Sequence, residues 1–145
     1  MKWDSIALGD LALERGGSVD PAKHPDEVFE LFSIPAFDAG TPEILQGSQI
    51  GSAKKAVETD DVMISRIVPH IRRACVVGRK NGHRQIASGE WIVFRSRKVW
   101  PQYLRWVLVG DTGHAFARKV PNVQLKPIDI PPSRVRAGFS PVDDR

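Results

Sequence analysis

The chain has 145 residues, of which 41% are hydrophobic and 26% are charged, and its formal net charge is +4. This composition is typical of a soluble globular protein and excludes a collagen, a coiled coil or a disordered chain. The single Cys75 excludes an internal disulfide bond. The N-terminus lacks the apolar region of a signal peptide, and no stretch approaches the roughly 18 apolar residues of a membrane span. We therefore expect one compact cytoplasmic domain that has no contact with a membrane.

The charge is distributed unevenly along the chain. Residues 1–62 carry five Lys/Arg and twelve Asp/Glu, a net charge of −7, whereas residues 63–145 carry sixteen and five, a net charge of +11. Between Arg66 and Lys119, twelve basic side chains face only Glu90 and Asp111 as acids. Such an asymmetry indicates a polyanionic partner, because clustered cations repel one another unless a partner neutralises them. The alternative is a basic face that meets an acidic face within the same monomer.

The first third of the chain predicts short elements separated by turns. A short helix or turn at Leu8 to Leu13 follows Ile6, and the glycines after it terminate it. Residues 28–34 are rich in bulky apolar side chains and stop at Pro35, which predicts a strand, with a helix as the alternative. Glycines and prolines make residues 36–55 a long loop with room for one short strand.

The remainder predicts three strands, two helices and a final extended segment. Asn81-Gly82 indicates a tight turn, and Pro101 suits the first turn of a helix. The strands lie at 62–68, 74–78 and 91–95, with polar connections at 69–73 and 79–85, helices at 101–110 and 114–119, and the extended segment at 127–132. The prediction is a mixed α/β, α+β domain of short twisted strands with a few helices over residues 1–132, followed by a flexible tail at 133–145.

The residues offer little for metal or nucleophilic chemistry. The four histidines are scattered, and one cysteine cannot form a thiolate zinc site, so we expect no metal and no cofactor. Cys75 stands in an apolar run, which favours an inert buried thiol. Asp60 or Asp61 could hold a catalytic cation together with Glu90, but carboxylates in turns before strands explain all three.

Methyl transfer from S-adenosylmethionine is a second catalytic alternative. Ile130-Pro131-Pro132-Ser133 resembles the Asn/Asp-Pro-Pro-aromatic motif of amino-methyltransferases, but both chemically active ends are replaced. A chain of this length also has little room for a cofactor-binding domain with its glycine fingerprint. We therefore predict a protein without catalytic activity.

Nucleic-acid binding is the function that the polar residues of the second half favour. Arg and Lys neutralise phosphates and contact guanine, and Asn and Gln contact adenine. The candidate DNA-binding residues are Lys54, Arg66, His70, Arg72, Arg73, Arg79, Lys80, Asn81, His83, Arg84, Gln85, Arg118, Lys119 and Asn122, with Gln124 and Lys126 beside the last group.

A series of short motifs resembles one family in its order along the chain. The series begins with Trp3 and the step Leu8-Gly9-Asp10-Leu11, and continues through residues 30–42, 50–54, 61–69, 87–94, 103–104 and 123–132. In this order they resemble a single target recognition domain of the DNA specificity (S) subunit of type I restriction-modification systems. Asp60 stands where glycine is usual in the family.

The resemblance implies sequence-specific binding of double-stranded DNA at one half-site, without catalysis. It also implies methyltransferase (modification) and restriction subunits as partners. The family normally continues into a long spacer helix and a second such domain, whereas Ile130-Pro131-Pro132-Ser133 is followed here by only twelve residues. The resemblance therefore leads us to expect a split, truncated or free-standing reader of one half-site. The alternative function is a protein-interaction module of the same fold that binds an acidic partner protein.

Overall fold

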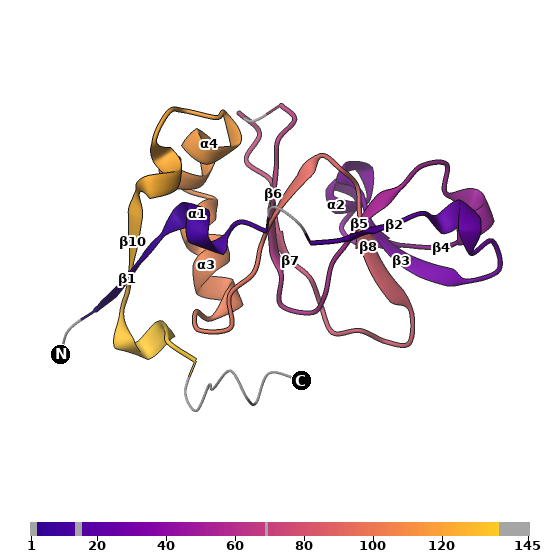
Figure 1. The fold of residues 1–145 in the computed structure, drawn as a ribbon, viewed down its shortest axis with the longest axis horizontal. Helices are drawn as coiled ribbons and strands as arrows, with labels where there is room; N and C mark the ends of the chain where they lie inside the picture. Colours follow the sequence, from indigo (N-terminus) through magenta and orange to yellow (C-terminus); the bar gives the residue numbers. More distant parts are fainter. Residues whose placement is uncertain (1–2, 14–15, 69, 137–145) are drawn as a thin grey trace.

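A three-stranded antiparallel sheet lies in the middle of the computed structural model, which describes residues 3–13, 16–68 and 70–136. Its strand order is β7 (Ala74–Val76), β6 (Val62–Ser65) and β9 (Trp91–Phe94). All four residues of β6 are buried, since both faces of this sheet are covered. Its position between two further groups of elements is visible in Figure 1.

A five-stranded sheet occupies one side of the central sheet, on the right in Figure 1. The order is β2 (Ser18–Val19), β5 (Lys54–Ala56), β8 (Arg84–Ala87), β3 (Val28–Phe32) and β4 (Glu43–Gln46). The pair β3 and β8 is parallel and the other pairs are antiparallel. The helix α2 (Ile34–Ala39) follows β3, and the 3₁₀ helices η1 (Pro21–Lys23) and η2 (Gly47–Gln49) lie in the connections.

Helices and a two-stranded ribbon occupy the other side, on the left in Figure 1. The ribbon pairs β1 (Asp4–Ala7) with β10 (Pro127–Ile130) in antiparallel register. Around it lie α1 (Leu8–Leu11), α3 (Pro101–Leu108), α4 (Asp111–Ala117) and the 3₁₀ helices η3 (Val123–Leu125) and η4 (Pro132–Arg134). The chain thus brings its first and last strands together, while its middle forms the two larger sheets.

The side chains of β6 point alternately to its two faces and so belong to both main hydrophobic clusters. Val62 and Ile64 pack with α1, α3, α4 and β10, whereas Met63 packs with Trp91 on the opposite face. Trp91 is fully buried, and its indole N–H donates to the carbonyl oxygen of Phe32 at 3.1 Å. This bond ties the central sheet to β3 of the five-stranded sheet.

The predicted class, a mixed domain of short strands with a few helices, is confirmed. The expected strands at 28–34, 62–68, 74–78 and 91–95, the helices at 101–110 and 114–119, and the extended segment at 127–132 all have counterparts. The short helix after Ile6 is α1. Their hydrophobic patterns are local and strong, so sequence periodicity is sufficient to find them.

The prediction of one long loop at 36–55 is wrong. This segment contains most of α2, then β4, η2 and β5. Its prolines and glycines mark helix ends rather than a loop, because Ser33 caps the start of α2 and Gly40, with φ of 93°, ends it. The polar connection expected at 79–85 is also shorter than predicted, since β8 begins at Arg84.

The expected tail at 133–145 is described only in part. Residues 132–134 form η4, and the backbone N–H of Arg136 donates to the carbonyl oxygen of Lys98 at 2.7 Å. The domain therefore extends at least to residue 136, four residues beyond the predicted boundary. Residues 137–145 lie outside the described part of the chain.

Candidate nucleic-acid interface

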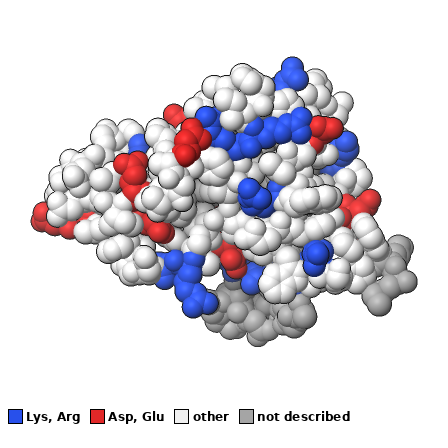
Figure 2. Space-filling model, turned by 180° about the vertical axis from the view of Figure 1, so that it is seen from behind, with Lys and Arg blue, Asp and Glu red and all other residues white. Residues whose placement is uncertain are grey.

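Many cations of the second half pair with carboxylates of the acidic first half. Figure 2 shows basic side chains interspersed with acidic ones on one face, rather than a single uninterrupted basic patch. The pairs are Arg73 with Asp38, Arg84 with Glu27, Arg95 with Glu58 and Asp61, Arg97 with Glu58, Lys98 with Asp4, and Arg136 with Asp60. Part of the charge asymmetry thus joins the two halves of the fold, as the alternative interpretation of the charge pattern predicts.

Three of the predicted DNA-binding residues are used within the fold. Gln85 is only 3% exposed, and its amide donates to Glu30 and to the carbonyl oxygen of Gly78, both at 2.8 Å. The prediction that Gln85 contacts DNA is inconsistent with this burial. Its position in β8 places it inside the sheet rather than on the predicted connection.

Arg73 and Arg84 make bidentate ion pairs instead of projecting freely. Arg73 donates to both oxygens of Asp38 at 2.9 and 3.1 Å, and the Arg73 side chain is only 11% exposed. Arg84 donates to Glu27 at 2.9 and 2.7 Å, and its guanidinium lies 5.1 Å from the centre of the Phe29 ring. These bonds lower the pKa of Asp38 and of Glu27. Both arginines tie neighbouring elements together.

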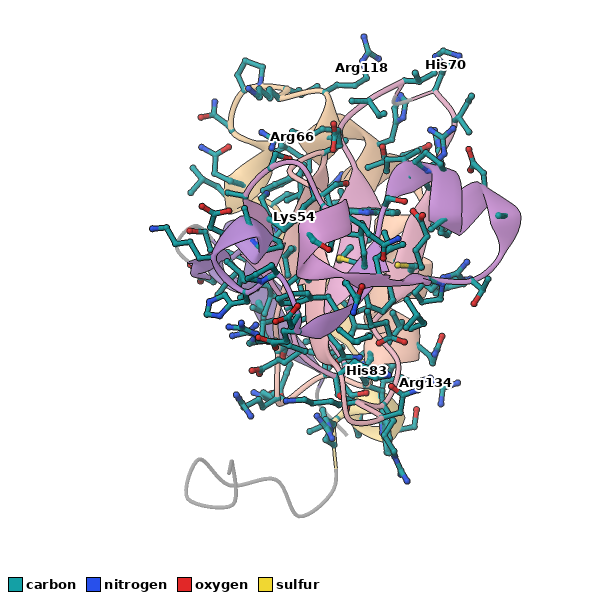
Figure 3. The ribbon with its side chains drawn as sticks, turned by 90° about the vertical axis from the view of Figure 1, so that its right-hand side faces the viewer. Lys54, Arg66, His70, His83, Arg118 and Arg134 are labelled. Atoms are coloured by element: carbon teal, nitrogen blue, oxygen red, sulfur yellow. The ribbon has the colours of Figure 1, made fainter. Side chains whose placement is uncertain are left out.

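A first basic cluster forms at one end of the molecule from three distant segments. Arg66, His70 and Arg118 lie at the same end in Figure 3, with Lys54 below Arg66. The connection after β6 and helix α4 are neighbours, because Arg72 and His114 line one small cavity. We define the first basic cluster as Lys54, Arg66, His70, Arg72, Arg118 and Lys119.

The cations of the first basic cluster are held loosely or not at all by acids. Arg66 is exposed and donates to the carbonyl oxygen of Gly89 at 2.5 Å. Arg72 pairs with Asp111 at 2.9 Å, but the Asp111 side chain is 95% exposed, so a phosphate can replace it at little cost. Arg118 and Lys119 are exposed and form no ion pair with any described residue.

The carboxylate of Glu90 lies near two of these cations, Lys54 and Arg66. The hydrogen bond from its own backbone N–H lowers the pKa of Glu90, and the positive charges of Lys54 and Arg66 lower it further. The backbone N–H of Arg66 also donates to the carbonyl oxygen of Glu90 at 2.8 Å. Glu90 thus lies near both Lys54, in β5 of the five-stranded sheet, and Arg66, which directly follows β6 of the central sheet.

A second basic cluster lies at the opposite end of the central sheet. It consists of Arg79, Lys80, Asn81 and His83, and His83 is at the other end from Arg66 in Figure 3. β7 separates the two clusters. The backbone N–H of Ser65 donates to the carbonyl oxygen of Arg73 at one end of the β6–β7 pair, and the backbone N–H of Asp60 donates to the carbonyl oxygen of Val77 at the other end. Gly82 has φ of 95°, in agreement with the turn predicted at Asn81-Gly82. The sequence analysis drew candidate DNA-binding residues from both of these connections, and the structure places the connections at opposite ends of the central sheet.

The remaining candidates follow α4. Lys119 and Asn122 have positive φ angles of 58° and 64°, which shows that the chain reverses sharply here. Asn122, Gln124 and Lys126 are exposed. Asn122 is therefore accessible close to the first basic cluster.

The carboxylates of the nuclease alternative do not meet. Asp61 precedes β6 and Glu90 precedes β9, and the antiparallel register puts Val62 opposite Phe94 and Ser65 opposite Trp91. The two acids therefore lie at opposite ends of the β6–β9 pair.

Within residues 3–13, 16–68 and 70–136, no group of three His, Cys, Asp or Glu side chains could hold a metal ion. Burial raises the pKa of the Cys75 thiol to about 11, so this thiol is protonated at neutral pH.

The sequence analysis did not identify an aromatic surface on α3. Trp106 lies within the helix predicted at 101–110, and it is 67% exposed. Trp100 is 46% exposed at the start of the same helix. No local pattern reveals this exposure, because it depends on which side of α3 the core covers.

Across the described part of the chain, no helix is long and apolar enough to cross a membrane.

Two solved structures share this fold. A chain from a type I R-M system, studied for its complex assembly and conformational transition, superposes with a TM-score of 0.73 at 21% identity, covering 92% of this chain and 39% of that chain. The HsdS subunit from Thermoanaerobacter tengcongensis gives a TM-score of 0.69 at 23% identity, covering 90% of this chain and 38% of that chain. This chain shares the fold of the HsdS subunit.

The resemblance drawn from sequence motifs is therefore confirmed in the fold. The chain spans about two fifths of the length of the HsdS and type I R-M chains that it matches. Sequence comparison with family models and with curated proteins gives no match. The structural likeness over nine-tenths of the chain thus exceeds what sequence similarity detects.

Proposed function

We propose that this chain binds double-stranded DNA sequence-specifically, as a non-catalytic target recognition domain that reads one half-site for a type I restriction-modification system. The observation that carries the proposal is the first basic cluster, in which two distant segments place exposed cations at one end of an HsdS fold, with the half-buried Lys54 of a third segment below them. Cations gathered from separate segments match the phosphates on two sides of a groove. Asn122 is close by for contacts with base edges.

The proposed partners follow from the same fold. A related chain belongs to a type I R-M system studied for complex assembly. We propose that modification and restriction subunits supply the chemistry, and that this cytoplasmic chain supplies recognition. The separation of Asp61 from Glu90 supports the absence of a nuclease centre in the chain itself.

Salt-dependent binding tests the proposal directly. The first basic cluster contains five permanent cations, so log K for duplex DNA should fall with log[salt] at a slope of about −4.5. Fluorescence anisotropy with a labelled duplex measures this slope, and selection from random duplexes identifies the half-site. Because one half-site is read, we expect an affinity in the micromolar range at physiological salt. A flat salt response, or tighter binding to polyglutamate than to DNA, contradicts the proposal and favours an acidic protein partner.

Catalysis by the chain alone is tested separately. Incubation of the purified protein with duplex DNA, Mg²⁺ and S-adenosylmethionine should yield no cleavage and no methyl transfer. Activity that is lost in Glu90→Ala would overturn the non-catalytic assignment. Loss of activity in Asp61→Ala alone is not diagnostic, because Asp61 supports the fold through Arg95.

A further inference from the structure

The aromatic surface on α3 has no role in the proposed DNA interface. Of the four tryptophans, Trp91 is fully buried, whereas Trp3, Trp100 and Trp106 are 54%, 46% and 67% exposed. Tryptophan carries a large apolar area, so leaving it in water is costly unless a partner covers it. Arg134, which borders this surface, lies at the opposite end from Arg118 and His70 in Figure 3.

Trp100 and Trp106 form two walls of a cavity of about 580 Å³, which Gln102, Tyr103 and Arg134 complete. The Tyr103 and Trp106 rings stack with centres 6.0 Å apart and an angle of 29°. The Tyr103 hydroxyl donates to the carbonyl oxygen of Asp129 at 2.8 Å, and the backbone N–H of Trp100 donates to that of Arg134 at 3.0 Å. These bonds fix the walls to β10 and η4, so the groove is formed before any ligand arrives.

The charge of the groove selects for a single carboxylate. Lys98 pairs with Asp4 at 3.0 Å, and Arg136 pairs with Asp60 at 3.5 Å while its guanidinium lies 5.9 Å from the centre of the Trp100 ring, so each of these neighbouring cations already has a carboxylate partner. Arg134 is exposed and forms no ion pair with any described residue. A nucleic-acid strand requires a groove in which several cations follow its phosphates. One available arginine among aromatic rings suits a peptide with an acidic side chain, and Trp, Tyr and Arg dominate the binding energy of protein interfaces.

The free hydrogen-bond donors indicate the backbone conformation of that peptide. No described residue accepts a hydrogen bond from the indole N–H of Trp100 or Trp106, or from the amide of Gln102. A polyproline II segment has no internal hydrogen bonds, so its carbonyl oxygens need such donors. A helix satisfies its own carbonyl groups and would leave these donors unused.

The spacing of the walls fits the same conformation. Trp106 follows Trp100, the N-cap residue of α3, by six positions, which corresponds to a rise of about 9 Å along a helix axis. Three residues of polyproline II also rise about 9 Å, and side chains three apart lie on the same face. Two prolines separated by two residues would therefore place one ring against each tryptophan.

We propose that the groove between Trp100 and Trp106 binds a proline-rich extended segment of a partner protein, with an acidic residue of that segment paired to Arg134. The two prolines pack against the indole rings, and Gln102 and the indole N–H groups donate to the peptide carbonyl oxygens. Recognition of this kind exploits the small entropy loss of a preformed polyproline II helix. It is independent of DNA binding, because the first basic cluster lies at the other end of the molecule.

Titration of the full chain with synthetic peptides tests the proposal. The probe is a ten-residue peptide with a Pro-x-x-Pro core followed by two aspartates, and the matched peptides replace both prolines by alanine or both aspartates by asparagine. We expect saturable changes in tryptophan fluorescence and in the NMR signals of the exposed indole N–H groups. The signal of the buried Trp91 should not change. Each replacement in the peptide should weaken binding about tenfold.

Variants of the protein assign the site. Trp106→Ala should weaken binding of the proline peptide at least about tenfold. Arg134→Gln should weaken binding only of the peptide that carries aspartate. Leu125→Ala removes an equally exposed apolar side chain elsewhere and should change nothing. Circular dichroism checks that each variant is folded, and duplex DNA affinity should be the same in all of them.

Three results would overturn the proposal. The first is that the proline peptide shows no saturable binding at concentrations up to about 1 mM, because a dissociation constant above this value is too weak for specific recognition. The second is equal affinity for the alanine peptide. The third is tighter binding of single-stranded oligothymidylate that is lost in Trp106→Ala, which would assign the groove to nucleic acid.

Discussion

The carboxylate of Asp61 accepts two hydrogen bonds from the guanidinium of Arg95, at 2.7 and 2.8 Å. Asp61 is only 1% exposed and also accepts the backbone N–H of Glu58 at 2.9 Å. The pair joins the residue before β6 to the residue after β9 and so closes one end of the central ladder. The hydrogen bonds that Arg95 donates to Asp61, together with the negative charge of Asp61, raise the pKa of Arg95.

Asp61→Ala should therefore lower the free energy of unfolding by about 3 kcal/mol, because it leaves a partly buried guanidinium without its partner. Urea denaturation followed by tryptophan fluorescence measures this change. Glu58→Ala is the matched control, since Glu58 approaches Arg95 at 3.3 Å but its side chain is 48% exposed. It should cost less than about 1 kcal/mol. Equal effects of the two variants would show that burial of the pair does not matter.

Arg66→Ala and Arg118→Ala should each weaken duplex DNA binding and reduce the salt slope by about 1, since each removes one phosphate contact. Anisotropy titrations at salt concentrations from roughly 50 to 200 mM measure both the affinity and the salt slope. Arg79→Ala and Lys80→Ala are controls of the same charge change in the second basic cluster. If these controls reduce the slope and the first pair does not, the interface lies at the opposite end.

Gln85→Ala should reduce stability rather than DNA affinity. The variant leaves the Glu30 carboxylate and the carbonyl oxygen of Gly78 without the donor that now bonds both. We expect a loss of about 1 to 3 kcal/mol in the free energy of unfolding and unchanged DNA affinity of the folded protein. A specific loss of affinity at full stability would restore Gln85 to the interface.

Gly113→Ala should disrupt the junction of α3 and α4. A Cβ atom at this position would lie 1.7 Å from the carbonyl oxygen of Leu108 and 2.5 Å from its carbonyl carbon, so the backbone must move. We expect a loss of about 3 kcal/mol. Gly89→Ala is the control, because nothing lies within 4 Å of a Cβ atom there, and its melting temperature should stay close to that of the parent.

A fall in pH should remove the contribution of the ion pair between Arg84 and Glu27 to the free energy of unfolding. The hydrogen bond from Arg84 lowers the pKa of Glu27, so the folded state holds this proton less tightly than the unfolded state. Its stabilisation is therefore present above the ordinary glutamate pKa and is lost as the pH falls through the lowered value. The difference in unfolding free energy between the parent and Arg84→Gln should shrink from pH 7 towards pH 3, about the acid end of carboxylate titration. Urea midpoints at several pH values test this, and a constant difference contradicts it.

The sequence by itself determined the local elements and the distribution of charge. The apolar runs around β6, β7 and β9 and the helical spacing of α3 carry enough local information to locate these elements. The charge asymmetry indicated a polyanionic partner. The ordered motifs indicated a target recognition domain of a type I specificity subunit, and the fold confirms that likeness.

Tertiary structure alone decided which polar side chains are available to a ligand. Arg84 and Glu27 are 57 residues apart in sequence and meet only because β8 docks beside β3. The same docking buries Gln85. Antiparallel pairing of β6 and β7 sends the two basic connections to opposite ends of a sheet. Hydrophobic periodicity reports the face of a local element that is buried, but ion pairing and exposure depend on contacts between distant elements.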